Sequence, residues 1–252
     1  MLTYFIGIDL AWSTKNLSGF AVLQWDGKSA RLVEEPITLK EDHEIVEHIN
    51  RIAGSDSVVI AVDAPLVVRN ENGYRSCEKE LALDFAKYEA AAHSSNRKLL
   101  CKYNSGEVRG EVLVERLAEI DIQHSAVIQP KKPMRQVFEV YPHPAMVTLF
   151  DLGKTLKYKA RLGRTVQDRY KAFGEYRDHL FSLSNAMPSA ILGLSETYHT
   201  LKGKQLKSYE DRLDAVFCAY IALYYWWWGE TKCRVFGTLA DGYIVTPYRQ
   251  RS

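Results

Sequence analysis

Two apolar segments that each end in an aspartate constrain the fold most. Residues 4–9 form a strand-favouring run that ends in Asp9, and residues 57–62 form a second run that is followed by Asp63. The second run is almost entirely apolar, which is typical of a central strand covered on both faces. Ligands bind at the carboxyl ends of strands in open α/β sheets. If these two strands are adjacent, Asp9 and Asp63 meet at that edge.

The segments between these two strands indicate how the sheet is connected. Residues 19–25 and 31–39 are predicted strands joined by short turns, which favours an antiparallel meander with the first strand. Apolar residues then recur at helical spacing over 45–52, and Gly54 is a stop signal. This order predicts three antiparallel strands, a crossover helix and a buried fourth strand.

The rest of the chain completes an α/β prediction. Residues 136–141 resemble a fifth strand. We predict one domain over residues 1–252, with a five-stranded mixed sheet of three antiparallel strands followed by parallel strands, flanked by helices. A helical insertion is expected after the fourth strand, at about 68–133. Further predicted elements are helices at 144–150, 167–183 and 208–228, and a hairpin at 235–246.

Asp211 and Asp214 add a second pair of carboxylates. They are three residues apart in a predicted helix, so their side chains project from one face about 5 to 6 Å apart at Cβ. Four carboxylates in a small space repel one another unless a cation lies among them, and oxygen-only ligands favour Mg²⁺ or Mn²⁺. In the alternative interpretation, Asp211 and Asp214 are first-turn acids favoured by the helix dipole, and Asp63 is a turn residue before Ala64.

Such a carboxylate site has a specific chemistry. Two divalent ions roughly 3.5 to 4 Å apart would clamp the attacking and leaving oxygens of a phosphodiester and lower the pKa of the attacking water. The pattern therefore predicts a metal-dependent nuclease.

Six short motifs resemble those of a known family. They are Gly7-Ile8-Asp9, Ala61-Val62-Asp63-Ala64-Pro65-Leu66, Arg75-Ser76-Cys77-Glu78, Glu139-Val140-Tyr141-Pro142, Asp211-Arg212-Leu213-Asp214-Ala215 and Asp241-Gly242-Tyr243-Ile244-Val245. Over essentially the whole chain they resemble the DUF429 family, whose members are regarded as ribonuclease H-like nucleases. The layout is also similar to that of the RuvC resolvases, which take one acid from the first strand, one from the fourth and a pair from the last helix. The resemblance implies metal-ligand roles for Asp9, Asp63, Asp211 and Asp214.

The chain departs from the family at one position. The family usually has an acid after Tyr-Pro, whereas this chain has His143. Glu139 is a candidate auxiliary catalytic ligand, with a solvated strand-end acid as the alternative. His143 is either a proton shuttle, since its unperturbed pKa is about 6.5, or a turn residue between two prolines.

Basic residues supply candidate substrate contacts. Arg75 follows Asp63 closely enough to reach a substrate phosphate, although a structural ion pair with Glu78 is the alternative. Residues 154–169 are the most basic segment. From this segment Lys154, Lys159 and Arg164 are candidate contacts to a phosphate backbone, with a solvated charged surface as the alternative.

Composition limits the partners. The chain has 33 Lys and Arg against 31 Asp and Glu, a net charge of +2. Such a chain lacks the basic excess of proteins that coat nucleic acid, so any nucleic acid must bind at a local basic site. Four scattered cysteines and no secretory signal indicate the cytoplasm. The apolar stretch 213–228 is shorter than the roughly 20 residues of a membrane span. The aromatic block 224–228 is expected to be core or a contact in a possible homo-oligomer, with base stacking as the alternative.

Two other functions remain open. A protein with this fold but without catalytic activity would bind nucleic acid or a nucleotide. The near-neutral net charge favours this alternative. An actin-like phosphotransferase also places an aspartate on its first strand, but it needs a glycine-bearing phosphate turn after it. The residues that follow Asp9 contain no glycine until Gly19.

Overall fold

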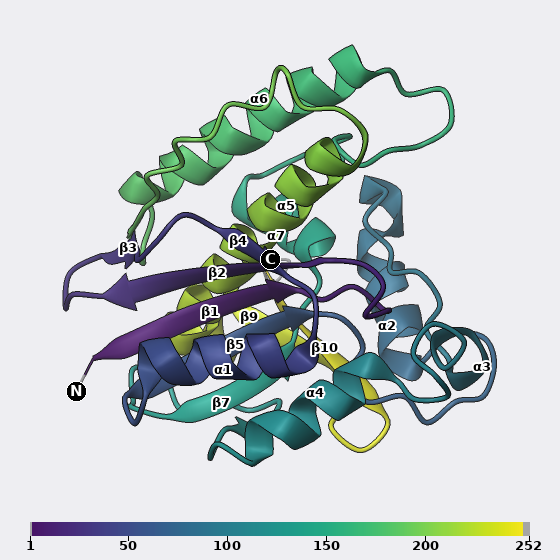
Figure 1. The fold of residues 1–252 in the computed structure, drawn as a ribbon, viewed down its shortest axis with the longest axis vertical. Helices are drawn as coiled ribbons and strands as arrows, with labels where there is room; N and C mark the ends of the chain where they lie inside the picture. The colour runs from purple at the N-terminus through teal and green to yellow at the C-terminus, as the bar shows by residue number, and fades with distance from the viewer. Residues whose placement is uncertain (1, 249–252) are drawn as a thin grey trace.

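A mixed sheet organises the molecule. The computed structural model describes residues 2–248, and Figure 1 shows their arrangement. At the centre, β1 (Thr3–Asp9) pairs antiparallel with β2 (Ser18–Trp25) and parallel with β5 (Ser57–Asp63). Outside these, β7 (Arg135–Glu139) lies parallel to β5, and β3 (Ala30–Leu32) lies antiparallel to β2. The mixed sheet of antiparallel and then parallel strands is therefore confirmed.

The short strands differ from the prediction. The expected strand at 31–39 consists of β3 and β4 (Ile37–Leu39), which both pair with β2 and are separated by a segment that contains Pro36. The two-residue strands β6 (Gln123–His124) and β8 (Ala190–Ile191) extend the two edges. Over the described residues the sheet therefore has eight strands rather than five. Strands this short carry too little alternation to be recognised in a sequence.

Helices cover both faces of the sheet. In Figure 1, α1 (Asp42–Ala53) and α4 (Arg109–Ala118) lie in front of it, and α7 (Gly203–Trp228) lies behind it. Side chains alternate accordingly, so Ile6 packs in the core with α1 and α4, whereas Phe5 packs in the core with α7. Because α4 belongs to this core, the segment 68–133 contributes to the packing of the sheet.

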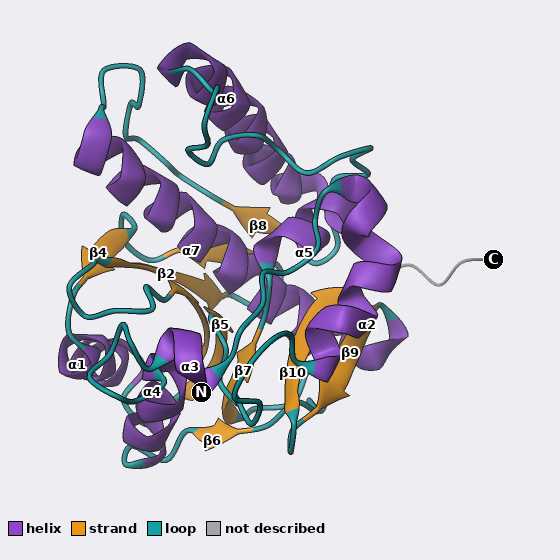
Figure 2. Ribbon diagram, turned by 90° about the vertical axis from the view of Figure 1, so that its right-hand side faces the viewer, coloured by secondary structure: helices purple, strands orange, loops and turns teal. Residues whose placement is uncertain are grey.

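The other elements form an outer layer, and they confirm the predicted helices and hairpin with small shifts of their ends. Figure 2 shows α6 outside α7, and the hairpin of β9 and β10 close to α2. Side chains of α2 pack with Phe236 and Ile244 of the hairpin, and a bridge from Val140 to Val245 joins the hairpin to the end of β7. The outer elements are α2 (Ser76–Phe85), η1 (Ala86–Tyr88), α3 (Arg97–Leu100), α5 (Pro142–Leu149), α6 (Val166–Ser182), η2 (Leu183–Asn185), η3 (Gly229–Thr231), β9 (Cys233–Thr238) and β10 (Gly242–Pro247).

Two glycines let α7 approach the sheet very closely. A Cβ atom on Gly7 would lie 1.9 Å from the carbonyl oxygen of Ala215, and one on Gly19 would lie 1.9 Å from the carbonyl oxygen of Asp211. Gly19 is also the β2 partner of Asp9. The absence of side chains at these two positions therefore brings the backbone of Asp211 next to the end of β1.

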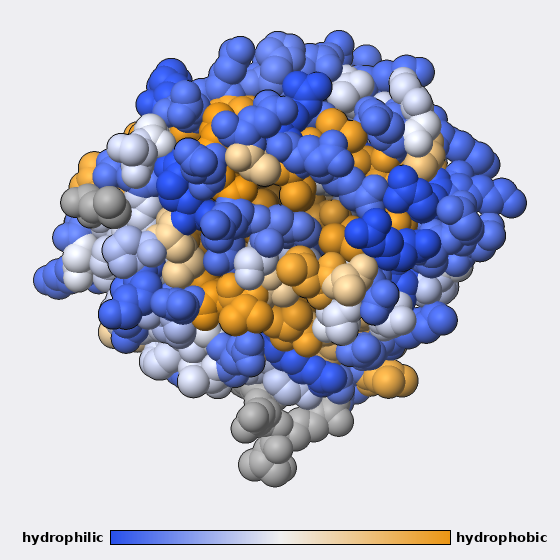
Figure 3. Space-filling view, turned by 90° about the horizontal axis from the view of Figure 1, so that it is seen from below, coloured by the Kyte–Doolittle hydropathy of each residue, from blue (hydrophilic) through white to orange (hydrophobic). Residues whose placement is uncertain are grey.

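Figure 3 shows one face of the molecule, seen from below. On this face, apolar residues gather in a central band among hydrophilic ones. Within residues 2–248, no helix has both the length and the apolar character needed to cross a membrane.

Candidate functional site

Asp9 and Asp63 end neighbouring strands at one edge of the sheet. They are direct partners in the parallel register of β1 and β5. Alternation along the strands places both on the same face as Phe5 and Val59, which is the face covered by α7. Both side chains are partly buried and line one cavity. The structure therefore brings these two acids together.

Asp211 and Asp214 approach the same edge from α7. The helix begins at Gly203 rather than at the predicted residue 208, so both acids lie beyond its first turn, which contains no acidic residue. The alternative interpretation, in which Asp211 and Asp214 are first-turn acids favoured by the helix dipole, is therefore wrong. Burial raises the pKa of Asp9 well above its usual range, and the charges of Asp214, Asp63 and Asp211 also raise it. Asp9 thus interacts with each of the other three predicted carboxylates.

Two lysines balance the charge of these acids. Lys159 Nζ lies 3.0 Å from Asp214 Oδ2. Lys207 pairs with Asp211 and, at 2.8 Å, with Glu210. Burial alone would lower the pKa of Lys159, but the charges of Asp214, Asp9 and Asp63 raise it well above its usual value, so its ammonium remains protonated. Lys159, predicted as a phosphate contact, therefore lies among the carboxylates.

Asp214 is the most enclosed of the four acids. It is fully buried, and its Oδ1 accepts hydrogen bonds from Tyr158 at 2.7 Å and from Tyr176 at 3.3 Å. Its Oδ2 accepts no hydrogen bond from the described residues, and Lys159 contacts it as an ion pair. Sequence reasoning missed both tyrosines because a buried tyrosine leaves no charge pattern. Because Oδ1 is held by the two tyrosines, Oδ2 is the oxygen of this carboxylate that faces Lys159.

A basic cavity of about 330 Å³ opens above Asp9 and Asp63. Arg164 lines it and also donates to the carbonyl oxygen of Lys159. Lys154 is exposed and pairs with Glu89 at the cavity rim, as Lys157 does. The cationic or imidazole groups that line the cavity are His93, His143, Lys157, Lys159, Arg161 and Arg164.

His143 is partly buried and lines this cavity. Its Nδ1 forms a 2.8 Å hydrogen bond with Thr155 Oγ1. Burial, together with the positive charge of Lys159, lowers the pKa of His143 well below its usual value. The imidazole is therefore neutral near pH 7.

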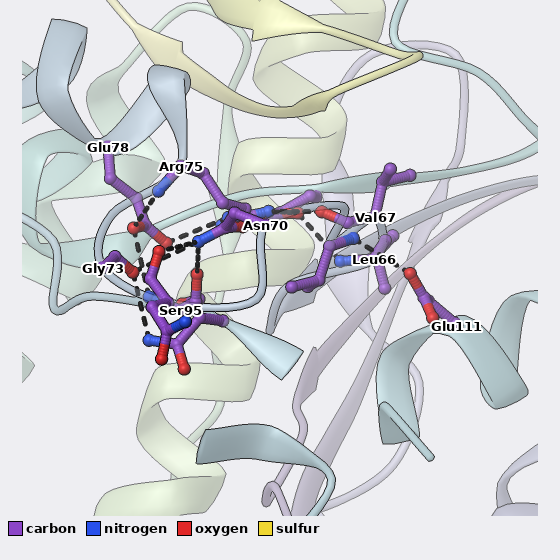
Figure 4. Close-up of polar contacts among 12 residues, drawn as sticks. Leu66, Val67, Asn70, Gly73, Arg75, Glu78, Ser95 and Glu111 are labelled. Atoms are coloured by element: carbon purple, nitrogen blue, oxygen red, sulfur yellow. Dashed lines mark hydrogen bonds and ion pairs between the residues drawn. The ribbon is translucent and has the colours of Figure 1, made fainter. Parts of the chain in front are cut away.

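Arg75 and Glu139 form a buried ion pair behind the acids. Arg75 is 3% exposed and donates to Glu139 Oε1 at 2.5 Å and to Oε2 at 2.9 Å. It also donates to Glu78 at 2.9 Å and to the carbonyl oxygen of Val67 at 3.1 Å. Figure 4 shows Arg75 between Glu78 and the loop that follows Asp63. The guanidinium of Arg75 thus forms its hydrogen bonds with groups of the protein itself.

Glu139 is held by the same network. It accepts the backbone N–H of Leu66 at 2.9 Å in addition to the two bonds from Arg75. In the sheet register it is paired with Val62, not with Asp63, so its side chain leaves the strand on the other face. Glu139 and Arg75 therefore fix the loop after Asp63, and they line a small cavity together with Asp63, whose pKa the charge of Glu139 also raises.

Replacing Arg75 with methionine is expected to destabilise the fold by about 3–5 kcal/mol, because Glu78 and Glu139 would be left buried without a cation. Urea unfolding measures this change. The matched control is Arg97→Met, which breaks the partly exposed 2.9 Å pair with Glu111 and is expected to cost about 1 kcal/mol or less. Equal effects of the two substitutions would contradict this account of Arg75.

Arg109 is a positioning residue that the sequence did not reveal. It is 2% exposed and donates to Asp42 at 2.8 Å, to the carbonyl oxygen of Ala11 at 2.8 Å and to that of Lys40 at 2.6 Å. It thereby fastens the loop that follows Asp9. A single arginine at the start of an amphipathic helix gives no signal of this role, because its partners are distant in sequence.

The metal-free protein is expected to lose stability as the pH rises from 5 to 8. Burial raises the folded-state pKa of Asp63 to about 7, and the charge of Asp214 contributes to this rise. A group whose pKa is raised by folding stabilises the protein below its unfolded pKa, and this contribution disappears as the pH passes the folded pKa. The expected loss is about 2–3 kcal/mol in urea unfolding with EDTA. Asp63→Asn should flatten the profile, and an unchanged slope in that variant would contradict the assignment.

The donor set suits a hard divalent cation, because carboxylate oxygens are the preferred ligands of Mg²⁺ and Mn²⁺. Asp214 Oδ2, which is buried and accepts no hydrogen bond within the described residues, supplies an available oxygen. Within residues 2–248, no group of three or more Asp, Glu, His or Cys side chains is arranged so that it could hold a metal ion without rearrangement. Lys159 occupies space among the carboxylates, so cation binding requires its ammonium to move away from Asp214.

Comparison with known protein families gives a match over most of the chain. A family model described as "Protein of unknown function (DUF429)" matches residues 7–237, a range that runs from β1 into β9 and includes all four aspartates. No curated protein and no solved structure matches the chain. The protein belongs to the DUF429 family.

Proposed function

We propose that this protein is a divalent-metal-dependent nuclease that hydrolyses phosphodiester bonds in nucleic acid, built on one ribonuclease H-like domain. The strand order β3-β2-β1-β5-β7, with three antiparallel strands followed by two parallel ones, supports that layout. The observation that carries the proposal is the alignment of Asp9 with Asp63 on the sheet face against which α7 brings Asp211 and Asp214.

The four aspartates are the proposed ligands of Mg²⁺ or Mn²⁺. The bound ion would stabilise charge on the phosphate oxygens and lower the pKa of the attacking water. Tyr158 and Tyr176 hold Oδ1 of Asp214, so that Oδ2, which faces Lys159, would be the oxygen that binds the ion. Arg75 and Glu139 act indirectly as positioning residues for the loop after Asp63.

The basic cavity is the proposed binding place for the scissile phosphate. Lys159 and Arg164 line it beside Asp9 and Asp63, and Arg161 lies at its exposed side. Such cations hold a phosphate by charge-assisted hydrogen bonds. The neutral imidazole of His143 lines the same cavity and would accept the proton that the attacking water releases.

A binding protein without turnover is the second candidate. Lys159 and Lys207 already balance the charges of Asp214 and Asp211. A carboxylate group neutralised in this way does not require a metal ion. If these ion pairs persist when Mn²⁺ is added, the protein would hold nucleic acid or a nucleotide without cutting it.

The two candidates are separated by one assay. Purified protein is incubated with labelled single-stranded DNA, duplex DNA, RNA and four-way junctions in Mg²⁺, in Mn²⁺ or in EDTA. The nuclease proposal expects cleavage of at least one substrate with either metal, none in EDTA, and none with Asp63→Asn or Asp214→Asn. Binding without cleavage in both metals would contradict the nuclease and support the binding protein.

A further inference from the structure

We propose that a second cavity, beside the carboxylates, binds an unpaired base of the substrate against Trp12 and Tyr103, so that the substrate is a single strand. This inference rests on the proposed nuclease, whose substrate class it specifies. The two claims make separate predictions, because binding can be measured without metal and cleavage with it.

The cavity has the size and position that such a site requires. Its volume is about 560 Å³, within the roughly 300–1,000 Å³ of small-molecule sites. Asp9 and Asp211 line one side of it. Asp9 and Trp12 line both this cavity and the basic one, so the two cavities meet at the carboxylates. A ligand that extends from one cavity into the other passes over Asp9.

Two aromatic rings line the cavity. The ring centroids of Trp12 and Tyr103 are 6.1 Å apart with planes at 49°, and Tyr103 is 47% exposed. Trp12 packs against the buried cluster of Val68, Leu100 and Val108. Arg109 holds the carbonyl oxygen of Ala11, so the backbone next to Trp12 is fixed. The rings thus form a supported surface on which a base can stack.

Cations complete the arrangement on both sides of the acids. Lys15, Lys204 and Lys207 line the aromatic cavity, and Lys159 and Arg164 line the basic one. A strand that places a base on Trp12 can therefore have its backbone neutralised in both directions. In a duplex, the faces of each base are covered by its neighbours and its pairing edge is occupied, so stacking on Trp12 requires an unpaired base.

The tryptophans near the end of α7 do not offer an equivalent surface. Trp226 is buried in the core. Lys131 lies 4.1 Å from the ring centroid of Trp227, and Lys232 lies 3.6 Å from that of Trp228. These rings are already in contact with a cation or the core. Trp12 and Tyr103 are therefore the better candidates for base stacking.

Fluorescence anisotropy in EDTA tests the inference, with a labelled oligothymidylate about 12 nucleotides long as the probe. We expect the single strand to bind at least about tenfold more tightly than a duplex of equal length, since the duplex has to be unpaired first. Tyr103→Leu and Trp12→Leu should each weaken binding of the single strand by about 5- to 150-fold, which corresponds to one lost stacking contact. Thymidine monophosphate should not compete at concentrations near the Kd of the oligonucleotide.

Matched variants separate stacking from folding. Tyr74 is 52% exposed and lines neither cavity, so Tyr74→Leu should leave the affinity unchanged. Trp12→Phe retains a ring and should bind within a few-fold of the unmodified protein. If circular dichroism shows that Trp12→Leu is unfolded, Tyr103→Leu and Trp12→Phe decide the question.

Three results would overturn the inference. They are equal affinity for duplex and single strand, unchanged affinity in Tyr103→Leu, and competition by the mononucleotide. The outcome for the nuclease is read separately in Mn²⁺. Single-strand binding that depends on Tyr103, without any cleavage, would support the base site and contradict the nuclease. Duplex cleavage that is unaffected by Tyr103→Leu would support the nuclease and contradict the base site.

Discussion

Replacing Asp9 with asparagine is expected to reduce Mn²⁺-dependent cleavage by about 10³-fold or more, because several kcal/mol of transition-state stabilisation depend on the bound cation. Asp9 ends β1 beside Asp63 and interacts with Asp211 and Asp214, so it is central to the proposed ligand set. The amide is nearly the same size, and it removes one of several mutually repelling charges. The variant should therefore fold at least as well, as measured by urea unfolding in EDTA.

The control for this variant is Asp178→Asn, which changes an exposed acid of α6 that lines neither cavity. Its cleavage rate should equal that of the unmodified protein. If Asp9→Asn retained full activity, Asp9 could not be a metal ligand in the reaction. If Asp9→Asn lost both its activity and its fold, the cleavage rate of Asp63→Asn would be measured instead.

Gly19→Ala is expected to destabilise the protein by at least about 3 kcal/mol or to prevent soluble expression. The new Cβ atom would lie 1.9 Å from the carbonyl oxygen of Asp211 and 2.4 Å from its carbonyl carbon. These are backbone atoms of α7 and cannot rotate away as a side chain can. The helix would have to move away from the sheet, and its aspartates would move with it. Urea unfolding measures the loss.

Gly193→Ala provides the matched control for this substitution. No atom lies within 4 Å of a Cβ built on Gly193, so the extra methyl group should change the unfolding free energy by less than about 1 kcal/mol. A Gly19→Ala variant with normal stability would show that α7 does not rest on β2 as closely as described.

The sequence predicted the strands that position the site because their signals are local. Residues 4–9 and 57–62 are apolar runs that end in an acid, and the structure places strands β1 and β5 there. Gly54 marked the end of α1 because it is the C-cap of that helix. The beginning of α7 had no such signal, since Lys202 provides no side-chain cap and the first residues of the helix are polar.

The ion pair of Arg75 with Glu78 was one of two alternatives that the sequence offered, and the structure shows it, but partners from distant segments could not be predicted. Lys159 appeared as a member of a basic run, but its ion-pair partner Asp214 is 55 residues away. Arg75 was close to Asp63 in sequence, yet its carboxylate partner Glu139 comes from another strand. Local charge patterns show which side chains are present. Only the folded chain shows which of them are already paired.

The most direct test of the central claim is a crystal structure of the protein soaked in Mn²⁺, with anomalous scattering used to locate the ion. The account predicts an anomalous peak at about 2.0–2.2 Å from carboxylate oxygens of Asp9 and Asp63, with Lys159 displaced from Asp214. A well-ordered structure without a peak between these carboxylates, and with the ion pair from Lys159 to Asp214 intact, would contradict it.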